Sequence, residues 1–186
     1  EIAQCLVGSE MCIRDRNFST NRVHLGMDEA VMLGLGNYLK ENGYKKGSLI
    51  IEEHCNRVVD ICRKLELKPM IWSDMYITAN STGGYYDLPE NTDCSKWEKP
   101  KKDLGLVYWD YYHADTRTYE KMLDIHAQLS DNVIFAGGSW IWNGISPNYS
   151  KTYACTKAAL STCKKYNIKE AVSYTHLRAH ETLSDL

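Results

Sequence analysis

Short apolar runs along the chain alternate with segments in which apolar residues recur at helical spacing. The short runs are typical of buried strands and the periodic segments of amphipathic helices. The predicted strands are residues 23–26, 69–73, 104–109 and 132–137, with a further strand beginning at 168–171, and the predicted helices are residues 49–65, 118–129 and 149–166. Because strands and helices alternate, we predict an α/β fold with a parallel sheet and right-handed crossovers.

Polar and aromatic residues follow directly on the ends of the predicted strands. The pairs are Asp28-Glu29, Ser73-Asp74 and Trp109-Asp110, and the segment 140–143 follows the fourth strand. This placement is typical of a (β/α) barrel, in which catalytic groups come from several strand ends at one face. A doubly wound open sheet also binds ligands at strand ends. No Gly-rich phosphate loop follows any strand, so we predict part of a (β/α)8 TIM barrel, about four to five of its eight units. Residues 80–100, rich in Gly, Asn, Asp and Tyr, are expected to form a long functional loop.

The two ends of the chain can be encoded by opposite strands of one nucleotide sequence. Codons for residues 6–16 can be chosen so that their reverse complement encodes residues 172–181. This resembles a translated sequencing adapter at both ends of an assembled fragment. We therefore expect residues 1–16 and 172–186 to be non-native and residues 17–171 to be the partial catalytic barrel.

Charge and cysteine content limit the functional classes. Three of the 22 Lys and Arg residues and five of the 24 Asp and Glu residues lie in residues 1–16 and 171–186, so that 19 of each remain. Such a balance gives no electrostatic footprint for nucleic acid or a membrane surface, and no apolar run approaches the length of a membrane span. Cysteines 55, 62, 94, 155 and 163 have no CxxC or zinc-like spacing. They are expected to be reduced, which favours an intracellular, cytoplasmic setting.

The neighbouring acids Asp28 and Glu29 have two interpretations. They could lie in the first turn of a helix, where the dipole favours acids by ~0.3–1 kcal/mol. If instead both face a pocket ~5 Å apart, their repulsion at an effective dielectric near 20 is roughly 3 kcal/mol, or about two pKa units. One acid would then keep its proton near neutrality beside a permanent anion, which is the arrangement used in glycoside cleavage.

Tryptophans form a second cluster of candidates. Trp72, Trp109, Trp140 and Trp142 lie at or next to strand ends, with Tyr76, Tyr108, Tyr111 and Tyr112 close by in sequence. This composition predicts an apolar-walled pocket with a few polar groups, suited to stacking against sugar rings.

The stretch 22–30, RVHLGMDEA, resembles the His-x-Gly-Gly/Met-Asp-Glu signature of family 20 glycoside hydrolases, the β-N-acetylhexosaminidases. Residues 34–39 and 68–76 (KPMIWSDMY) are similar to a bacterial branch of that family, and the resemblance covers residues 21–170. It implies that Glu29 is the general acid and that Asp28 orients the 2-acetamido group of the substrate. That group would attack the anomeric carbon in a retaining reaction that needs no enzyme nucleophile.

The resemblance also implies substrate-binding residues. Tyr108 and Asp110 match a Tyr-x-Asp motif, and Tyr108 would donate a hydrogen bond to the acetamido oxygen. Trp72 and either Trp140 or Trp142 would wall the pocket. The motif histidine, His24, is expected to be a buried residue hydrogen-bonded behind the acids.

The sequence departs from the family pattern in two ways. The family usually has a Trp-x-Glu motif whose acid hydrogen-bonds sugar hydroxyls. The corresponding residues here, 140–144, are Trp-Ile-Trp-Asn-Gly and contain no acid. The first half of the barrel, with a sugar-binding arginine, is also missing, so the isolated fragment is expected to be inactive.

Two other classes remain open. A non-catalytic carbohydrate-binding barrel fragment would keep the aromatic strand ends without cleavage. A metal-dependent hydrolase could use His24, Asp28, Asp74 and His113, although no HxH or HExxH spacing supports it. We expect no metal and no cofactor, and a carbohydrate substrate bearing terminal β-linked GlcNAc or GalNAc.

Overall fold

A computed structural model describes residues 19–142 and 144–175 of the 186-residue chain. The strands are β1 (Arg22–His24), β2 (Lys68–Trp72), β3 (Gly105–Trp109), β4 (Val133–Gly138) and β5 (Ala171–Tyr174). The helices are α2 (Asn37–Asn42), α3 (Gly47–Lys64), α4 (Asp74–Thr78), α5 (Thr116–Leu129) and α6 (Tyr149–Lys165). The segment 1–16, expected to be non-native, lies outside the described residues, as does 176–186.

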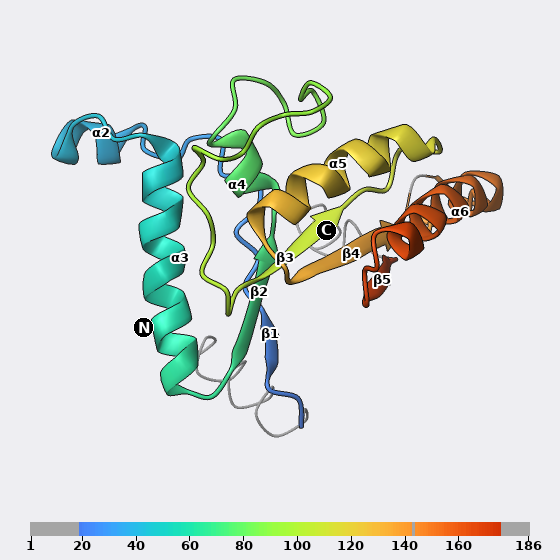
Figure 1. Ribbon diagram of the computed structural model, residues 1–186, viewed down its shortest axis with the longest axis horizontal. Coiled ribbons are helices and arrows are strands. Elements are labelled where there is room, and N and C mark those ends of the chain that lie inside the picture. Colours follow the sequence, from blue (N-terminus) through green and yellow to red (C-terminus); the bar gives the residue numbers. More distant parts are fainter. Residues whose placement is uncertain (1–18, 143, 176–186) are drawn as a thin grey trace.

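The five strands form one parallel sheet in the order β1-β2-β3-β4-β5. The sheet curls, and α3, α5 and α6 lie along it so that the described chain forms an α/β half-barrel (Figure 1). The predicted α/β class and parallel sheet are therefore confirmed. Compatibility with a partial barrel follows from the curl of the sheet and from the strand order.

The predicted strands and long helices occur within a few residues of their expected bounds. The short helices α2 and α4 lie in segments for which no helix was predicted, and residues 79–104 have no regular strand or helix, as expected for the long loop. The fifth strand begins at Ala171, so residues 172–174, expected to be non-native, pair with β4. Backbone groups make this pairing, and almost any sequence supplies them.

The two faces of the sheet carry different side chains. Ile71, Leu106, Tyr108 and Phe135 point toward the helices and form the main core with residues such as Met122 of α5. The alternate positions form a second, smaller cluster on the inner face, which comprises Met70, Trp72, Val107, Trp109, Ile134 and Ala136. Because successive residues of a strand point to opposite faces, this alternation decides which strand-end residues can meet a ligand inside the curve.

The five cysteines of the described residues, 55, 62, 94, 155 and 163, are buried and free. Cys55 and Cys62 lie on the packed face of α3, as their spacing predicted. Burial raises the pKa of the Cys55 and Cys163 thiols to about 11, which keeps both protonated. In the described part of the chain no helix is both long and apolar enough to cross a membrane.

A buried chain of hydrogen bonds ties α5 to the end of β2. The Nδ1 of His126 donates to the Met122 carbonyl at 2.6 Å, so its Nε2 accepts from the Ser73 hydroxyl at 2.7 Å. The Ser73 oxygen in turn accepts from the Tyr85 hydroxyl at 2.9 Å. Burial lowers the pKa of His126 to about 4. The neutral ring is therefore a structural requirement of this end of the sheet.

We expect the free energy of unfolding to fall as the pH drops from about 6.5 to about 4, because the unfolded chain binds a proton that folded His126 does not. The slope is about 1.4 kcal/mol per pH unit, and His126 adds no slope above pH 6.5. Urea denaturation at several pH values measures it. His126→Gln, which does not titrate, should lose this contribution, whereas His54→Gln on the exposed face of α3 should keep it. Equal slopes in both variants would contradict the assignment.

Candidate active site

The loop that follows β1 presents the two neighbouring acids at the carboxyl edge of the sheet. It does not continue into a helix, since the next helix begins at Asn37. Met27 and Glu29 have left-handed backbones, with φ of 70° and 47°. The interpretation that Asp28 and Glu29 occupy the first turn of a helix is therefore wrong. Both side chains are exposed.

A buried carboxylate holds the left-handed turn. The backbone N–H of Glu29 donates to Asp74 Oδ2 at 2.8 Å, and the N–H of Ala30 lies 3.2 Å from the sulfur of Met75. Left-handed conformations are costly for residues other than glycine and persist where surrounding contacts enforce them. The bond to Asp74 provides such a contact, because it joins the β1 loop to the first turn of α4.

Asp74 is only 2% exposed and binds groups from two elements. Its Oδ1 accepts from the indole N–H of Trp109 at 3.4 Å, at the end of β3. Burial raises the pKa of Asp74, and the nearby negative charge of Asp28 raises it further, while the bonds from Glu29 and Trp109 oppose the shift. Asp74 thus links three strand ends.

Aromatic rings cover the inner face beside these acids. His24 packs on Trp72 with 4.5 Å between ring centroids, and Tyr111 contacts Trp109 and Trp142 at 5.7 and 5.9 Å. Trp142 also lies 5.0 Å from Trp140. Such a row of rings provides the flat apolar faces on which sugar rings stack.

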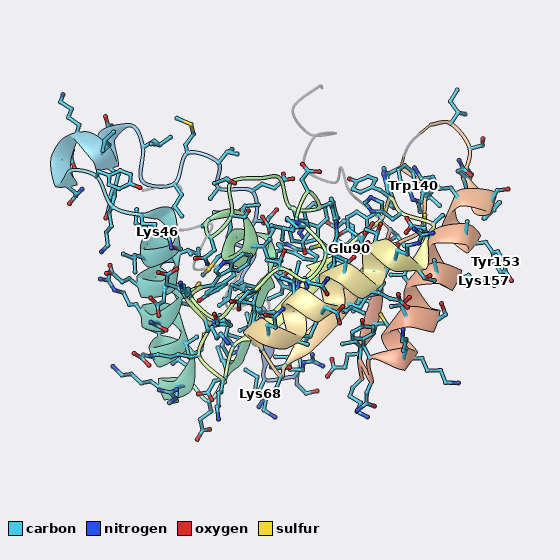
Figure 2. All side chains as sticks on the ribbon, turned by 45° about the horizontal axis from the view of Figure 1, so that its top comes forward. Lys46, Lys68, Glu90, Trp140, Tyr153 and Lys157 are labelled. Carbon is cyan, nitrogen blue, oxygen red and sulfur yellow. The ribbon has the colours of Figure 1, made fainter. Side chains whose placement is uncertain are left out.

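Trp140 anchors the segment after β4, near the start of α6 (Figure 2). Its indole N–H donates to the Tyr111 carbonyl at 2.5 Å, and Lys151 Nζ lies 3.6 Å above the ring. The side chain is 6% exposed. Trp140 therefore acts mainly as a support for the neighbouring rings, and Trp142 is the more accessible of the two tryptophans.

The structure places Tyr108, a predicted substrate-binding residue, in the core. This side chain is 0% exposed and belongs to the helix-facing core, because its position in β3 alternates with Trp109. Its hydroxyl donates to Asp110 Oδ2 at 3.1 Å. Asp110 is 1% exposed and also accepts from the backbone N–H groups of Tyr112 and His113, and its Oδ2 lies 2.8 Å from the ring Nδ1 of His113. Both side chains are thus buried in this structure, and their substrate-binding roles stay predictions.

The expectation of a buried His24 is also wrong, because the residue is exposed on the inner face at the end of β1. Its Nδ1 accepts from the N–H of Gly26 at 3.1 Å. Partial desolvation lowers the pKa of His24, and the charge of Asp28 opposes this shift. His24 is thus a neutral ring that supports the turn and Trp72.

The acids act electrostatically on residues across the site. The charge of Asp28 contributes to the raised pKa of Tyr111, and that of Glu29 to the raised pKa of Tyr112, although burial is the larger cause for both tyrosines. The β1 loop and the segment after β3, about 80 residues apart in the chain, are therefore close enough in space for their charges to interact.

The structure brings Asp28, Glu29, His24, Trp72 and Trp142 to one edge of the sheet, with Trp140 behind them. Asp74, Trp109 and Tyr111 belong to the same region; the sequence analysis placed all three at or near strand ends, but the family resemblance assigned none of them a substrate-binding role. Strict alternation along β3 was the signal for Trp109, because Val107 and Trp109 share the inner face while Leu106 and Tyr108 share the other.

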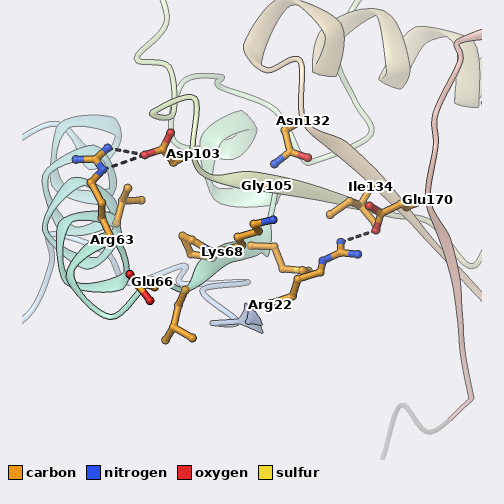
Figure 3. Close-up of a pocket in the computed structure, with 13 residues that line it drawn as sticks. Arg22, Arg63, Glu66, Lys68, Asp103, Gly105, Asn132, Ile134 and Glu170 are labelled. Carbon is orange, nitrogen blue, oxygen red and sulfur yellow. Dashed lines mark hydrogen bonds and ion pairs between the residues drawn. The ribbon is translucent and has the colours of Figure 1, made fainter. Parts of the chain in front are cut away.

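Two cavities flank the sheet at opposite ends. One, of about 630 Å³, lies between the β1 loop and α4, with Glu29, Asp74 and Trp109 on its wall. The other, of about 720 Å³, lies at the amino ends of the strands (Figure 3). There Arg22 pairs with Glu170 and Arg63 with Asp103. In an α/β barrel that end serves stability, and the carboxyl end carries chemistry.

Among the described residues, no group of three or more His, Cys, Asp and Glu side chains is arranged to hold a metal ion. His113, one residue of the metal hypothesis, bonds Asp110 at 2.8 Å and packs on Tyr86 at 4.8 Å.

Comparison with known proteins finds no family model that matches the chain and no significantly similar curated protein.

Proposed function

We propose that this chain is part of an eight-stranded (β/α) barrel of a β-N-acetylhexosaminidase, which removes terminal β-linked GlcNAc or GalNAc with retention of configuration. One observation supports this proposal most. Glu29 is presented by a left-handed turn at the carboxyl edge of the sheet, beside Asp28 and next to a row of tryptophans. The signature at residues 22–30 is the independent support.

The proposed reaction uses the two acids in different ways. Glu29 donates its proton to the glycosidic oxygen as the bond between that oxygen and the anomeric carbon breaks. The acetamido oxygen of the substrate forms a bond to the same carbon, and Asp28 accepts the acetamido N–H and balances the positive charge of the oxazolinium ion. Water then attacks the anomeric carbon, Glu29 takes its proton, and the ring reopens. Because the nucleophile belongs to the substrate, its attack is intramolecular, which can be worth several kcal/mol.

Tyr111 is a better candidate than Tyr108 for the hydrogen bond to the acetamido oxygen. The donor has to lie near Asp28, since both contact the same acetamido group, and the charge of Asp28 acts on Tyr111. Tyr111 also packs against the inner-face ring of Trp109. Tyr108 is committed to Asp110 in the core.

We expect Tyr111→Phe to lower kcat on N-acetyl-β-glucosaminides roughly tenfold, the cost of one hydrogen-bond donor of about 1.4 kcal/mol. Tyr108→Phe should leave kcat near that of the parent and lower the free energy of unfolding instead, because it removes one bond to buried Asp110. Steady-state kinetics and urea denaturation of both variants measure this. A loss of kcat in Tyr108→Phe, with kcat unchanged in Tyr111→Phe, would instead assign the ligand hydrogen bond to Tyr108.

The function is tested with the chain completed to eight β/α units. An aryl N-acetyl-β-glucosaminide should be hydrolysed, and proton NMR of the first product should show the β-anomer. Inversion, or hydrolysis that is lost on adding a chelator, would overturn the proposal. Binding of GlcNAc without any product would support the alternative, a non-catalytic carbohydrate-binding barrel.

A further inference from the structure

The cavity of about 630 Å³ beside Glu29 is of the size that takes a small organic group. Its wall comes from the β1 loop, from α4 and the start of α3, and from the aromatic residues Tyr85 and Trp109. Glu29 stands on this wall. In the proposed function Glu29 protonates the departing oxygen, so the group attached to that oxygen has to leave from the side of the acid.

Most of the side chains on the wall are apolar. They are Ala30, Val31, Leu33, Met75, Ala79, Tyr85 and Trp109. These side chains present apolar surface that a bound hydrophobic group would cover. Covering it stabilises the complex by about 25 cal/mol per Å² of apolar area removed from water.

Apart from the carboxylate of Glu29, the polar side chains of the wall are already engaged. Thr78 Oγ1 donates to the backbone carbonyl of Asp74 at 2.9 Å, and the Tyr85 hydroxyl donates to Ser73. Asp74 accepts from Glu29 and Trp109. A sugar in this cavity would bring several hydroxyl groups and find few partners for them, and an unpaired buried polar group costs about 1–3 kcal/mol.

We infer that this cavity is the leaving-group subsite and that it takes an apolar aglycone, an alkyl or aryl group, in preference to a second sugar. The inference rests on the proposed function, which supplies the role of Glu29. It adds the substrate class: a single N-acetylhexosamine attached to a hydrophobic group.

The test is a binding series on the full 186-residue chain with methyl, butyl and hexyl N-acetyl-β-glucosaminides. These ligands share one sugar and differ only in apolar length. We expect Kd to tighten roughly two- to fourfold per methylene, so that the hexyl compound binds at least roughly 30-fold more tightly than the methyl compound. Tryptophan fluorescence and calorimetry both measure the series.

Two variants locate the effect. Leu33→Ser and Val31→Ser place a hydroxyl on the cavity wall, and both should flatten the dependence on alkyl length. Val31 is 88% exposed, so its replacement carries little risk for folding. The matched control is Leu39→Ser on α2, which lies outside the cavity and should keep the full dependence.

The outcomes separate the two proposals. No dependence on alkyl length in the parent chain, no measurable binding of the hexyl compound, or an unchanged dependence in both cavity variants would overturn the apolar subsite. Hexyl β-glucoside, which lacks the acetamido group, tests the function. If it binds as tightly as its acetamido counterpart and Leu33→Ser weakens both, the cavity stands and the hexosaminidase proposal fails.

Discussion

Glu29→Gln in the completed barrel is expected to lower kcat/KM on alkyl N-acetyl-β-glucosaminides by about 10³-fold, which lies within the range for loss of general acid catalysis. The amide keeps the size of the side chain and cannot give a proton to the departing oxygen. Aryl glycosides with acidic leaving groups depend less on that proton, so their kcat/KM should fall much less. Steady-state rates on an alkyl and a nitrophenyl substrate measure the difference.

The matched control is Glu90→Gln, an exposed acid of the long loop, which should leave both rates unchanged (Figure 2). An equal loss on both classes of substrate in Glu29→Gln would show that Glu29 binds the sugar and is not the acid. Unchanged rates would remove Glu29 from the mechanism altogether.

Asp110→Ala is expected to lower the free energy of unfolding by about 2–4 kcal/mol, because each buried donor left without a partner costs about 1–3 kcal/mol. The carboxylate is 1% exposed and accepts from the Tyr112 and His113 backbone at 2.9 and 3.2 Å, and from Tyr108 at 3.1 Å. Truncation leaves these donors without their acceptor. Urea denaturation followed by tryptophan fluorescence measures the loss.

Asp131→Ala, an exposed acid before β4, serves as the control and should change the free energy by less than about 0.5 kcal/mol. A loss below about 1 kcal/mol in Asp110→Ala would mean that Asp110 is free for a ligand, as the Tyr-x-Asp motif implies. It would then return to the binding site.

The arrangement of strands and long helices followed from the sequence because both have regular apolar periods. The burial of Tyr108 follows from the two-residue period of β3, which the Tyr-x-Asp motif by itself does not reveal. Tyr108 and Leu106 share the helix-facing side, and Val107 and Trp109 share the inner face. The alternation of side chains along β3 thus places Tyr108 in the core and Trp109 on the inner face.

The backbone of the acid pair could not be derived from local sequence. Asp28-Glu29 at a strand end is equally compatible with a helix N-terminus, and residues other than glycine rarely adopt positive φ. The deciding contact is the bond from the Glu29 N–H to Asp74, 45 residues further along the chain. Short helices such as α4 escape prediction for a similar reason, because packing rather than intrinsic propensity stabilises them.

The order of the strands has a consequence for how the chain folds during synthesis. Within residues 19–142 and 144–175, each of β2, β3 and β4 pairs only with the strand before it and the strand after it in the sequence. Every new strand and helix can therefore dock on the last unit to leave the ribosome, without waiting for a distant segment. The sequence separation of paired strands is therefore about that of one β/α unit, and folding is faster where contacting segments lie closer together in the sequence.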